Sequence, residues 1–375
     1  MKLLHAADLH LAPRLAYIED ENNRRRRRED FAAQVDRLPV LAREHAVEAV
    51  ILAGDVFDRD LPAVPEVGRL HRAFQDLEKA GVVVLVAPGT HDPWRPGGIW
   101  DQRWPANVHI FRSGQWESVV VGDVAFYGIA HTGGPKEGSL FDGIPYTENA
   151  RLHVGIAHAS LLHAYLKERV DGKNYPFEEG ELDQTHFNYL ALGDHHNPNA
   201  VTRGRLTAAY PGSPEGLGLD RAEVGPRYML VVDVDSVDDP PTLQQVQTNR
   251  REVYLDTVSL MEVQHEPRAI VAEEVRRTLL AAASPDRLAR FSFSGTLEFP
   301  LDIDAAVAEA ASGYFLLDVR DHTRMIPESP AEARTIRAGF EARLARTIEQ
   351  AGDEREAEIA RRALSLGLQA LEGLL

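Results

Sequence analysis

The sequence predicts an α/β fold: a layered sandwich of two mixed sheets flanked by helices, followed by a small α/β cap domain and C-terminal helices. Three observations support it. Short apolar runs alternate with longer amphipathic stretches in the first half, several later apolar runs follow one another without helical spacers, and a second alternation begins after an acidic, proline-containing stretch. The 375 residues also exceed the usual extent of one hydrophobic core.

The first half has the pattern of a βαβαβ arrangement. Strands are expected at 2–7, 48–53 and 82–87, with helices near 29–45 and 63–80 between them. Later apolar runs predict further strands at 108–111, 118–121, 124–129, 152–157, 189–192 and 227–234. Because most of these lack intervening helices, the second sheet is expected to be largely antiparallel.

A polar stretch separates the expected domains. Residues 235–241 are acidic and contain a proline pair, so a first domain is expected at 1–245 and a capping domain at 250–327. A helical segment should then occupy 328–375. Within the cap, strands are expected near 252–259, 289–299 and 314–319, and helices near 268–282 and 303–311. Ser329, Pro330 and Glu332 have the pattern of a helix start.

Composition limits the chemistry. The formal charge of −17 argues against a protein that coats nucleic acid through bulk electrostatics. Cysteine is absent, so disulfides, thiolate ligands and cysteine nucleophiles are excluded, and any metal must be held by oxygen and imidazole. No apolar run is long enough for a membrane span and no leader pattern opens the chain, so a cytoplasmic location without a membrane partner is expected.

Acidic and imidazole side chains follow five of the expected strands. Each could belong to an ordinary turn. Together they are hard to explain as packing, because the carboxyl ends of strands in open α/β sheets form the ligand-binding edge. The residues, in chain order, are Asp8 and His10, Asp55 and Asp58, Thr90, His91 and Asp92, His158, and Asp194, His195 and His196.

These blocks resemble the calcineurin-like metallophosphoesterase superfamily, whose pattern is D-x-H, G-D-x-x-D, G-N-H-D/E, a later H, and G-H-x-H. Here they are D-L-H, G-D-V-F-D, G-T-H-D, His158 and G-D-H-H. The opening M-K-L-L-H-A-A-D-L-H-L and the segment I-L-A-G-D-V-F-D-R are similar to the bacterial DNA repair exonucleases of the SbcD and YhaO type. The resemblance covers residues 1 to about 235 and implies a layered metallophosphoesterase sandwich; beyond that only the domain order matches.

The resemblance implies two divalent metal ions, with Mn²⁺ expected and Mg²⁺ or Fe²⁺ as alternatives. Asp55 would bridge them. The sequence departs from the family at Thr90, where Asn is usual, and at Asp194, where His is usual; Asp194 is a harder ligand and the Thr90 hydroxyl a weak one. His195 is an alternative to Asp194. The first ion would take Asp8, His10, Asp55 and His196, and the second Asp55, Thr90, His158 and Asp194.

The same resemblance assigns the proton chemistry to His91. Two cations can activate a water and clamp the attacking and leaving oxygens of a phosphodiester. His91 matches the family histidine that stabilises the transition state or protonates the leaving oxygen, a task suited to imidazole. Asp92 or Asp58 would orient its ring.

The leading hypothesis is a manganese-dependent DNA exonuclease or single-strand endonuclease in DNA repair, working with an SMC-like ATPase of the SbcC or YhaN type. A small-molecule phosphodiesterase or phosphatase is one alternative. A DNA-repair scaffold with an impaired second metal site is another. A homodimer is also considered, because a tryptophan-rich loop has the composition of either a dimer surface or a packed loop.

Three surface features have two interpretations each. Arg24 to Arg28 either contact a nucleic-acid backbone or form a solvated helix end. Trp94, Trp100 and Trp104 either stack on unpaired bases or pack within their loop or at a dimer surface. The apolar stripe of the terminal helices either folds back on the cap or binds a partner helix.

Overall fold

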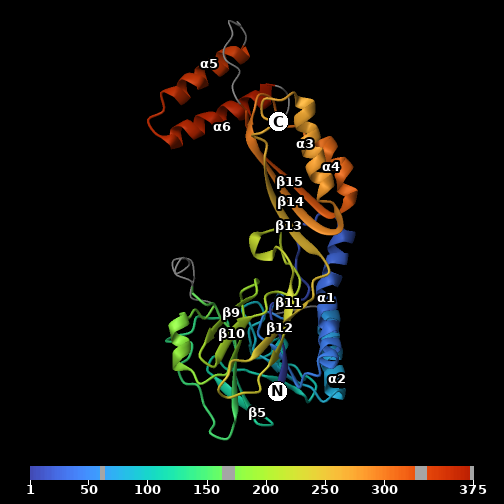
Figure 1. Cartoon of the computed structure of the whole chain (residues 1–375), viewed down its shortest axis with the longest axis vertical. Helices are drawn as coiled ribbons and strands as arrows, with labels where there is room; N and C mark the ends of the chain where they lie inside the picture. The colour runs from blue at the N-terminus through green and yellow to red at the C-terminus, as the bar shows by residue number, and fades with distance from the viewer. Residues whose placement is uncertain (60–63, 163–173, 326–335, 372–375) are drawn as a thin grey trace. The chain divides into compact units, whose positions relative to one another are not determined.

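The computed structural model describes residues 1–59, 64–162, 174–325 and 336–371. They form two compact units, Met1–Glu252 and Val253–Leu375 (Figure 1). The expected boundary at 327/328 and the helix start at Ser329 lie outside the described residues. Within the described ranges no helix has both the length and the apolar character needed to cross a membrane.

The first unit contains two six-stranded mixed sheets. The first has the order β12-β11-β1-β2-β3-β4 and the second the order β5-β6-β7-β8-β10-β9. The strands of the first sheet are β1 (Lys2–Ala6), β2 (Ala49–Leu52), β3 (Val83–Val86), β4 (Val108–Ile110), β11 (Tyr228–Asp233) and β12 (Thr242–Gln247). Those of the second are β5 (Glu117–Val121), β6 (Val124–Ile129), β7 (Leu152–His158), β8 (Tyr189–Gly193), β9 (Asn199–Arg203) and β10 (Leu206–Tyr210).

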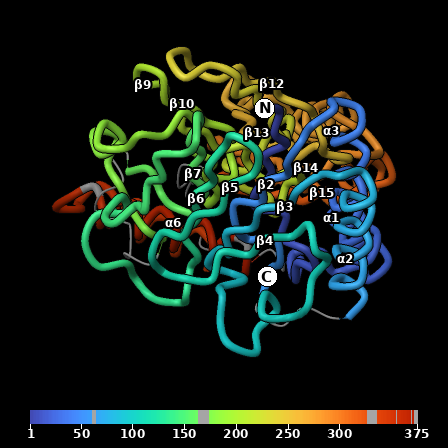
Figure 2. The backbone as a smooth tube through the Cα atoms, turned by 90° about the horizontal axis from the view of Figure 1, so that it is seen from below, coloured from blue at the N-terminus to red at the C-terminus, as the bar shows by residue number. Residues whose placement is uncertain are grey.

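The central strands β1, β2 and β3 of the first sheet are buried on both faces. Alternate residues of β1 point in opposite directions: Leu3 packs with the second sheet, and Leu4 packs under helices α1 (Glu21–Glu44) and α2 (Val64–Lys79). These helices lie side by side in both Figure 1 and Figure 2. Burial on both faces explains why these strands are continuous apolar runs. The predicted layered sandwich is confirmed.

The expectation of a largely antiparallel second sheet was wrong. Strands β6, β7, β8 and β10 run parallel, and only the edge strands β5 and β9 are antiparallel to their neighbours. Parallel neighbours need long crossover connections, which are usually helical. Residues 130–151 connect β6 to β7 without an α-helix, so the sequence lacked the usual signal.

Strand β12 was missed because its sequence T-L-Q-Q-V-Q is mostly polar. It forms the exposed edge of the first sheet and pairs with β11 along its whole length. The compact unit therefore continues to Glu252 and does not end in a linker near residue 245. Strands β9 and β10 were missed as well.

A buried ionic cluster joins α1 to the end of the first unit. Arg27 Nη1 donates to Glu215 Oε1 at 2.7 Å, and the backbone N–H groups of Arg250 and Arg251 donate to the same carboxylate at 2.8 and 3.3 Å. Arg251 pairs with Asp30. The side chains of Arg27 and Glu215 are 0% exposed. Because water is excluded, each charge is compensated by the other.

This cluster and nearby hydrogen bonds engage part of the arginine run within the chain. Arg27 is buried, Arg24 Nε donates to the Ile18 carbonyl at 2.9 Å, and Arg28 Nε donates to the Pro13 carbonyl at 3.1 Å. Three of the five guanidinium groups therefore hold the start of α1 against this chain's own backbone and side chains. Arg25 and Arg26 are exposed, so contact of these two with a nucleic-acid backbone stays a prediction.

The second unit is a three-stranded sheet with helices. Its order is β13-β14-β15, and the core lies between the sheet and helices α3 and α4. The elements are β13 (Glu252–Ser259), α3 (Arg268–Ala281), β14 (Ser284–Leu297), α4 (Asp304–Ala310), β15 (Tyr314–Met325), α5 (Ile336–Glu349) and α6 (Glu354–Leu371).

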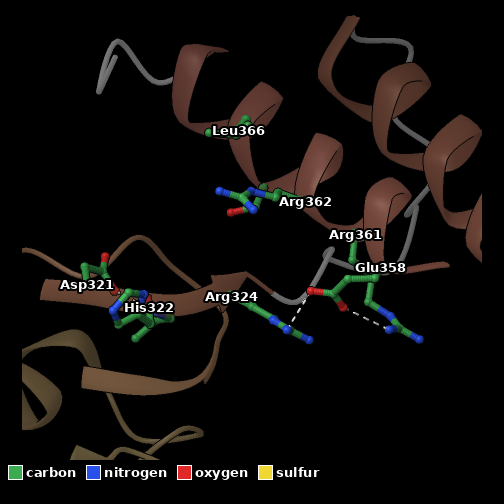
Figure 3. A pocket seen from close by; sticks show the side chains of 9 residues that line it. Asp321, His322, Arg324, Glu358, Arg361, Arg362 and Leu366 are labelled. Atoms are coloured by element: carbon green, nitrogen blue, oxygen red, sulfur yellow. Dashed lines mark hydrogen bonds and ion pairs between the residues drawn. The ribbon is translucent and has the colours of Figure 1, made fainter. Parts of the chain in front are cut away.

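The terminal helices fold back within this unit. Helix α6 packs on α5 so closely that a Cβ added at Gly367 would lie 2.2 Å from Phe340 Cζ. It also contacts β15, where Arg324 pairs with Glu358 at 2.6 Å and Glu358 accepts from Arg361 at 3.4 Å (Figure 3). Helix α6 thus folds back on the cap, whereas the stripe of α5 packs on α6 and Ile336 is 85% exposed, so a partner helix there stays a prediction.

A buried histidine in β1 gives the first unit an acid sensitivity. His5 Nδ1 lies 2.7 Å from the Tyr189 hydroxyl, and burial lowers the pKa of the imidazole to about 3. Below pH 6.5 the unfolded chain binds a proton that the folded chain does not, so stability should fall as pH drops from 6.5 towards 3. Between pH 7 and pH 5 this loss should be about 2 kcal/mol, and His5→Gln should abolish it.

Urea unfolding of both proteins at the two pH values, followed by tryptophan fluorescence, measures the difference. Equal pH dependence in wild type and variant would contradict it.

Candidate metal centre

Five strands of the two sheets deliver polar side chains to one place. The loops after them are hydrogen-bonded to each other: Asp8 N–H donates to the Gly54 carbonyl at 3.1 Å, and His10 N–H donates to the Asp55 carbonyl at 2.9 Å. Asp8, His10, Asp55 and Asp194 all have left-handed backbone, with φ of 52°, 43°, 49° and 104°. This conformation is uncommon for residues other than glycine, and such strain is typical of functional sites.

The side chains form three overlapping groups that could hold metal ions. In each group the potential ligand atoms lie within 4.8 Å of one another. Asp8, His10 and Asp55 each belong to two of them, so neighbouring groups share a ligand. The groups are Asp8, His10 and His196; His10, Asp55 and His91; and Asp8, Asp55 and His158.

The imidazole orientations fit metal binding. His158 is buried, its Nδ1 lies 3.1 Å from the Ala53 carbonyl, and its Nε2 faces Asp55 Oδ2 at 3.3 Å. His196 Nδ1 lies 2.5 Å from Glu223 Oε1, which leaves Nε2 facing His10 Nε2 at 3.2 Å. Metal-binding histidines are commonly fixed in this way through the other ring nitrogen. The residues therefore fit divalent ions.

The charges of the site are strongly coupled. Burial raises the pKa of Asp8. Burial also opposes ionisation of Asp55, but His158, His10 and His91 outweigh it and lower the pKa of this carboxyl well below its usual range. Burial lowers and Glu223 raises the pKa of His196, which reaches about 9. In the metal-free site, protonated imidazoles therefore compensate the carboxylate charges. Bound cations would take over this compensation.

The loop after β3 supports Asp55. His91 N–H donates to Asp55 Oδ1 at 2.8 Å, and the Thr90 hydroxyl donates to Oδ2 at 3.2 Å. A Cβ added at Gly89 would lie 2.2 Å from Asp55 Oδ1, so only glycine allows this close approach. Thr90 therefore positions the Asp55 carboxylate.

Asp194 is held from several sides. Its backbone N–H donates to both carboxylate oxygens of Asp8 at 3.2 Å. Its own carboxylate accepts from the Ser160 hydroxyl and from Asn174 Nδ2, and Oδ1 lies 3.7 Å from His158 Nε2. The neighbouring His195 instead stacks on Tyr210, with 4.3 Å between ring centroids.

The two carboxylates suggested to orient His91 have different surroundings. His91 Nδ1 lies 3.2 Å from the Asp58 carbonyl oxygen and 3.9 Å from Asp58 Oδ1. Asp92 is buried and accepts backbone N–H groups from Val56, Phe57 and Gly89 at 2.9, 3.1 and 2.8 Å. Asp58 is thus the residue beside the His91 ring, whereas Asp92 ties the loops after β2 and β3 together.

The tryptophan-rich loop is packed. Trp100 is buried, and Trp94 and Trp104 are partly buried against the core under α1 and α2. Trp100 and Trp104 contact each other, with 5.5 Å between ring centroids. These three side chains therefore pack within the protein, as one of the two interpretations predicted.

Residues 1–215, more than half of the chain, match the calcineurin-like phosphoesterase family. The chain belongs to this family. Its relatives include the uncharacterized metallophosphoesterase YhaO of Bacillus subtilis, 27% identical over 253 residues, covering 64% of this chain and 58% of YhaO. The DNA double-strand break repair protein Mre11 of Haloferax volcanii is 26% identical over 319 residues, covering 76% of this chain and 67% of Mre11.

The SbcD component of nuclease SbcCD from Bacillus subtilis is 26% identical over 255 residues, covering 57% of this chain and 61% of SbcD. The matches to YhaO and SbcD thus span less than two thirds of those relatives. Among solved structures, a dimetal phosphatase from Danio rerio aligns with a TM-score of 0.40 and 12% identity, covering 66% of this chain and 98% of the phosphatase. Membership of the calcineurin-like phosphoesterases supports a metal-dependent hydrolase, and the three residue groups agree with the divalent-metal binding of that fold.

Three supporting residues of this phosphoesterase centre were not predicted from the sequence. Ser160 and Asn174 hold Asp194, and Glu223 holds His196. Ser160 follows His158 by two positions at the end of β7, whereas Asn174 and Glu223 lie away from the identified motifs, Glu223 following His196 by 27 positions. Only a Ser or Asn near a motif aspartate would have been a signal, and such residues are common in loops.

Glu223→Gln should weaken metal binding about 10- to 100-fold, because His196 would lose the carboxylate that fixes its ring. Glu223 also accepts from Leu217 N–H at 3.0 Å, a bond that glutamine can keep. Isothermal titration of metal-free protein with Mn²⁺ measures the change. Glu179→Gln, at an exposed carboxylate paired with Arg203, is the control. Equal Mn²⁺ affinity in Glu223→Gln and wild type would contradict the role.

Proposed function

We propose that this phosphoesterase is a DNA nuclease, an exonuclease or single-strand endonuclease that acts in DNA repair with an SMC-like ATPase partner of the SbcC or YhaN type. The observation that carries the proposal is the convergence of carboxylates and imidazoles around Asp55 at one sheet edge. The names of the relatives, a DNA double-strand break repair protein and a nuclease component, favour DNA among phosphodiesters. Such a role would place the protein in the cytoplasm.

The proposed ligands divide into two halves that share Asp55. Asp8, His10 and His196 would complete the first half, and Thr90, His158 and Asp194 the second. Two bound divalent ions, Mn²⁺ in the first instance, would supply an activated water and charge neutralisation at the phosphodiester. The bridging position falls to Asp55 because both His10 Nε2 and His91 Nε2 lie 4.0 Å from its Oδ2, and His158 Nε2 lies 3.3 Å from it.

His91 is the proposed proton donor. Its side chain is 48% exposed, so substrate can reach it, whereas the other imidazoles of the centre are at most 20% exposed. With Nδ1–H directed at the Asp58 carbonyl, the protonated ring presents Nε2–H to the leaving oxygen. Asp58 acts here through its backbone, as a positioning residue.

A small phosphodiester is the second candidate substrate. The formal charge of −17 and the internal bonding of Arg24, Arg27 and Arg28 favour it, because both reduce the cationic surface available to a nucleic-acid backbone. A scaffold protein with an impaired second site is a third candidate, based on Thr90 and Asp194.

One assay panel separates these functions. Full-length protein is tested on linear duplex DNA, single-stranded DNA and bis-p-nitrophenyl phosphate, each with Mn²⁺, Mg²⁺ or chelator. The nuclease proposal expects metal-dependent cleavage of DNA. Cleavage of the small ester alone would favour the second candidate, and no turnover on any substrate would favour the scaffold.

A further inference from the structure

The two halves of the proposed centre have unequal donor chemistry. The half around His10 and His196 offers two imidazoles, with Nε2 atoms 3.2 Å apart. The half around His158 offers one imidazole, and its other donors, Asp55, Thr90 and Asp194, are oxygens. The difference between the halves depends on Asp194, which stands where the family has histidine.

The carboxylate of Asp194 is oriented towards His158. Asn174 Nδ2 donates to Oδ1 at 2.8 Å, the Ser160 hydroxyl donates to Oδ2, and Oδ1 remains 3.7 Å from His158 Nε2. A carboxylate oxygen has two lone pairs, so Oδ1 can accept from Asn174 and still bind a cation. Two hydrogen bonds fix it in that position.

The buried His158 side chain lies beside this carboxylate and is a potential metal ligand. His158 is 1% exposed, its Nδ1 lies 3.1 Å from the Ala53 carbonyl, and its Nε2 is directed at carboxylates and not at a backbone group. Asp55 Oδ2 lies 3.3 Å from this nitrogen. His158 Nε2 thus has a carboxylate oxygen of Asp55 at 3.3 Å and one of Asp194 at 3.7 Å, and the Thr90 hydroxyl donates to Asp55.

We propose that Asp194 makes the His158 half of the centre selective for a hard divalent cation such as Mn²⁺ or Mg²⁺, while the His10 and His196 half keeps a preference for softer transition ions. Oxygen ligands favour Mg²⁺ and Mn²⁺, and imidazole favours Zn²⁺ and Fe²⁺. The inference rests on the metal centre of the proposed function but not on its DNA substrate.

The test replaces the carboxylate by imidazole. Metal-free full-length protein is titrated with Mn²⁺ and Zn²⁺ by calorimetry, and bound ions are counted by mass spectrometry. Because Zn²⁺ binds most sites more tightly than Mn²⁺, the quantity of interest is the ratio of their affinities at each site. In Asp194→His this ratio should shift towards Zn²⁺ at one site, about 10-fold or more, and stay constant at the other.

Three further variants complete the design. Asp194→Asn keeps the shape and removes the charge, so it should weaken Mn²⁺ at one site even if Asp194→His fails to fold. Ser160→Ala should weaken Mn²⁺ at that site about 10-fold by releasing the carboxylate. Asp238→Asn, at an exposed carboxylate in the turn before β12, is the control and should change neither ion.

Equal changes of Mn²⁺ and Zn²⁺ affinity in Asp194→His, or unchanged Mn²⁺ binding in Asp194→Asn, would overturn the proposal. These readouts record ion binding alone. A protein that fails to cleave DNA but shows the expected shift would therefore refute the nuclease function and leave the selectivity intact.

Discussion

Replacing His91 with alanine should lower turnover of a phosphodiester about 10²- to 10⁴-fold, the usual contribution of a general acid. The ring is half-exposed and anchored through Nδ1 near the Asp58 carbonyl, so its loss removes the proton donor at the mouth of the site. Metal binding should change less, because His91 contributes to only one of the three ligand groups and Asp55 keeps its other partners.

Steady-state kinetics with bis-p-nitrophenyl phosphate at saturating Mn²⁺ give the comparison, with ion counts on the same samples. His265→Ala is the control, since this histidine is 68% exposed in the second unit and pairs with Glu298. Unchanged turnover at full metal occupancy would show that His91 is not the proton donor.

Replacing Glu215 with alanine should destabilise the first unit by about 3–5 kcal/mol. The variant leaves Arg27 buried without its closest counter-charge and leaves the backbone N–H groups of Arg250 and Arg251 without their acceptor. The cost comes from the uncompensated charge, not from a strong native attraction. Glu215→Gln should cost less, because the amide oxygen still accepts hydrogen bonds.

Urea unfolding followed by tryptophan fluorescence measures this effect, because all four tryptophans lie in the first unit. The matched control is Glu29→Ala, which breaks a surface pair between α1 and Arg69 and should cost no more than about 1 kcal/mol. Similar decreases in the free energy of unfolding in both alanine variants would contradict a larger contribution from the buried pair.

The convergence of the candidate ligands was predictable because several of them obey a local rule. Asp8, Asp55 and His158 stand directly after apolar runs, and the carboxyl ends of parallel strands meet at one edge. The two positions that depart from the family pattern were also visible in the sequence. The structure added what surrounds them: Thr90 donates to Asp55, and Asp194 is held by Ser160 and Asn174.

Long-range polar pairing was not predictable from one sequence. Glu215 bonds Arg27 across 188 positions, and nothing near either residue indicates the other. The arginine run therefore looked like a charged surface, although one of its members is buried. The prediction that the second sheet is largely antiparallel failed because the crossover between β6 and β7 has no helical periodicity to detect.

The segment from Ser213 to Glu223 follows β10 without a strand or an α-helix, yet it has two fixed points. Glu215 binds the α1 cluster, and Glu223 binds the His196 ring. Because both acids are held by long-range contacts, the number of residues between them is constrained, unlike that of an ordinary surface loop. A single-residue insertion between them should be tolerated far less well than one in the β5–β6 hairpin, because it must displace either the helix anchor or the histidine.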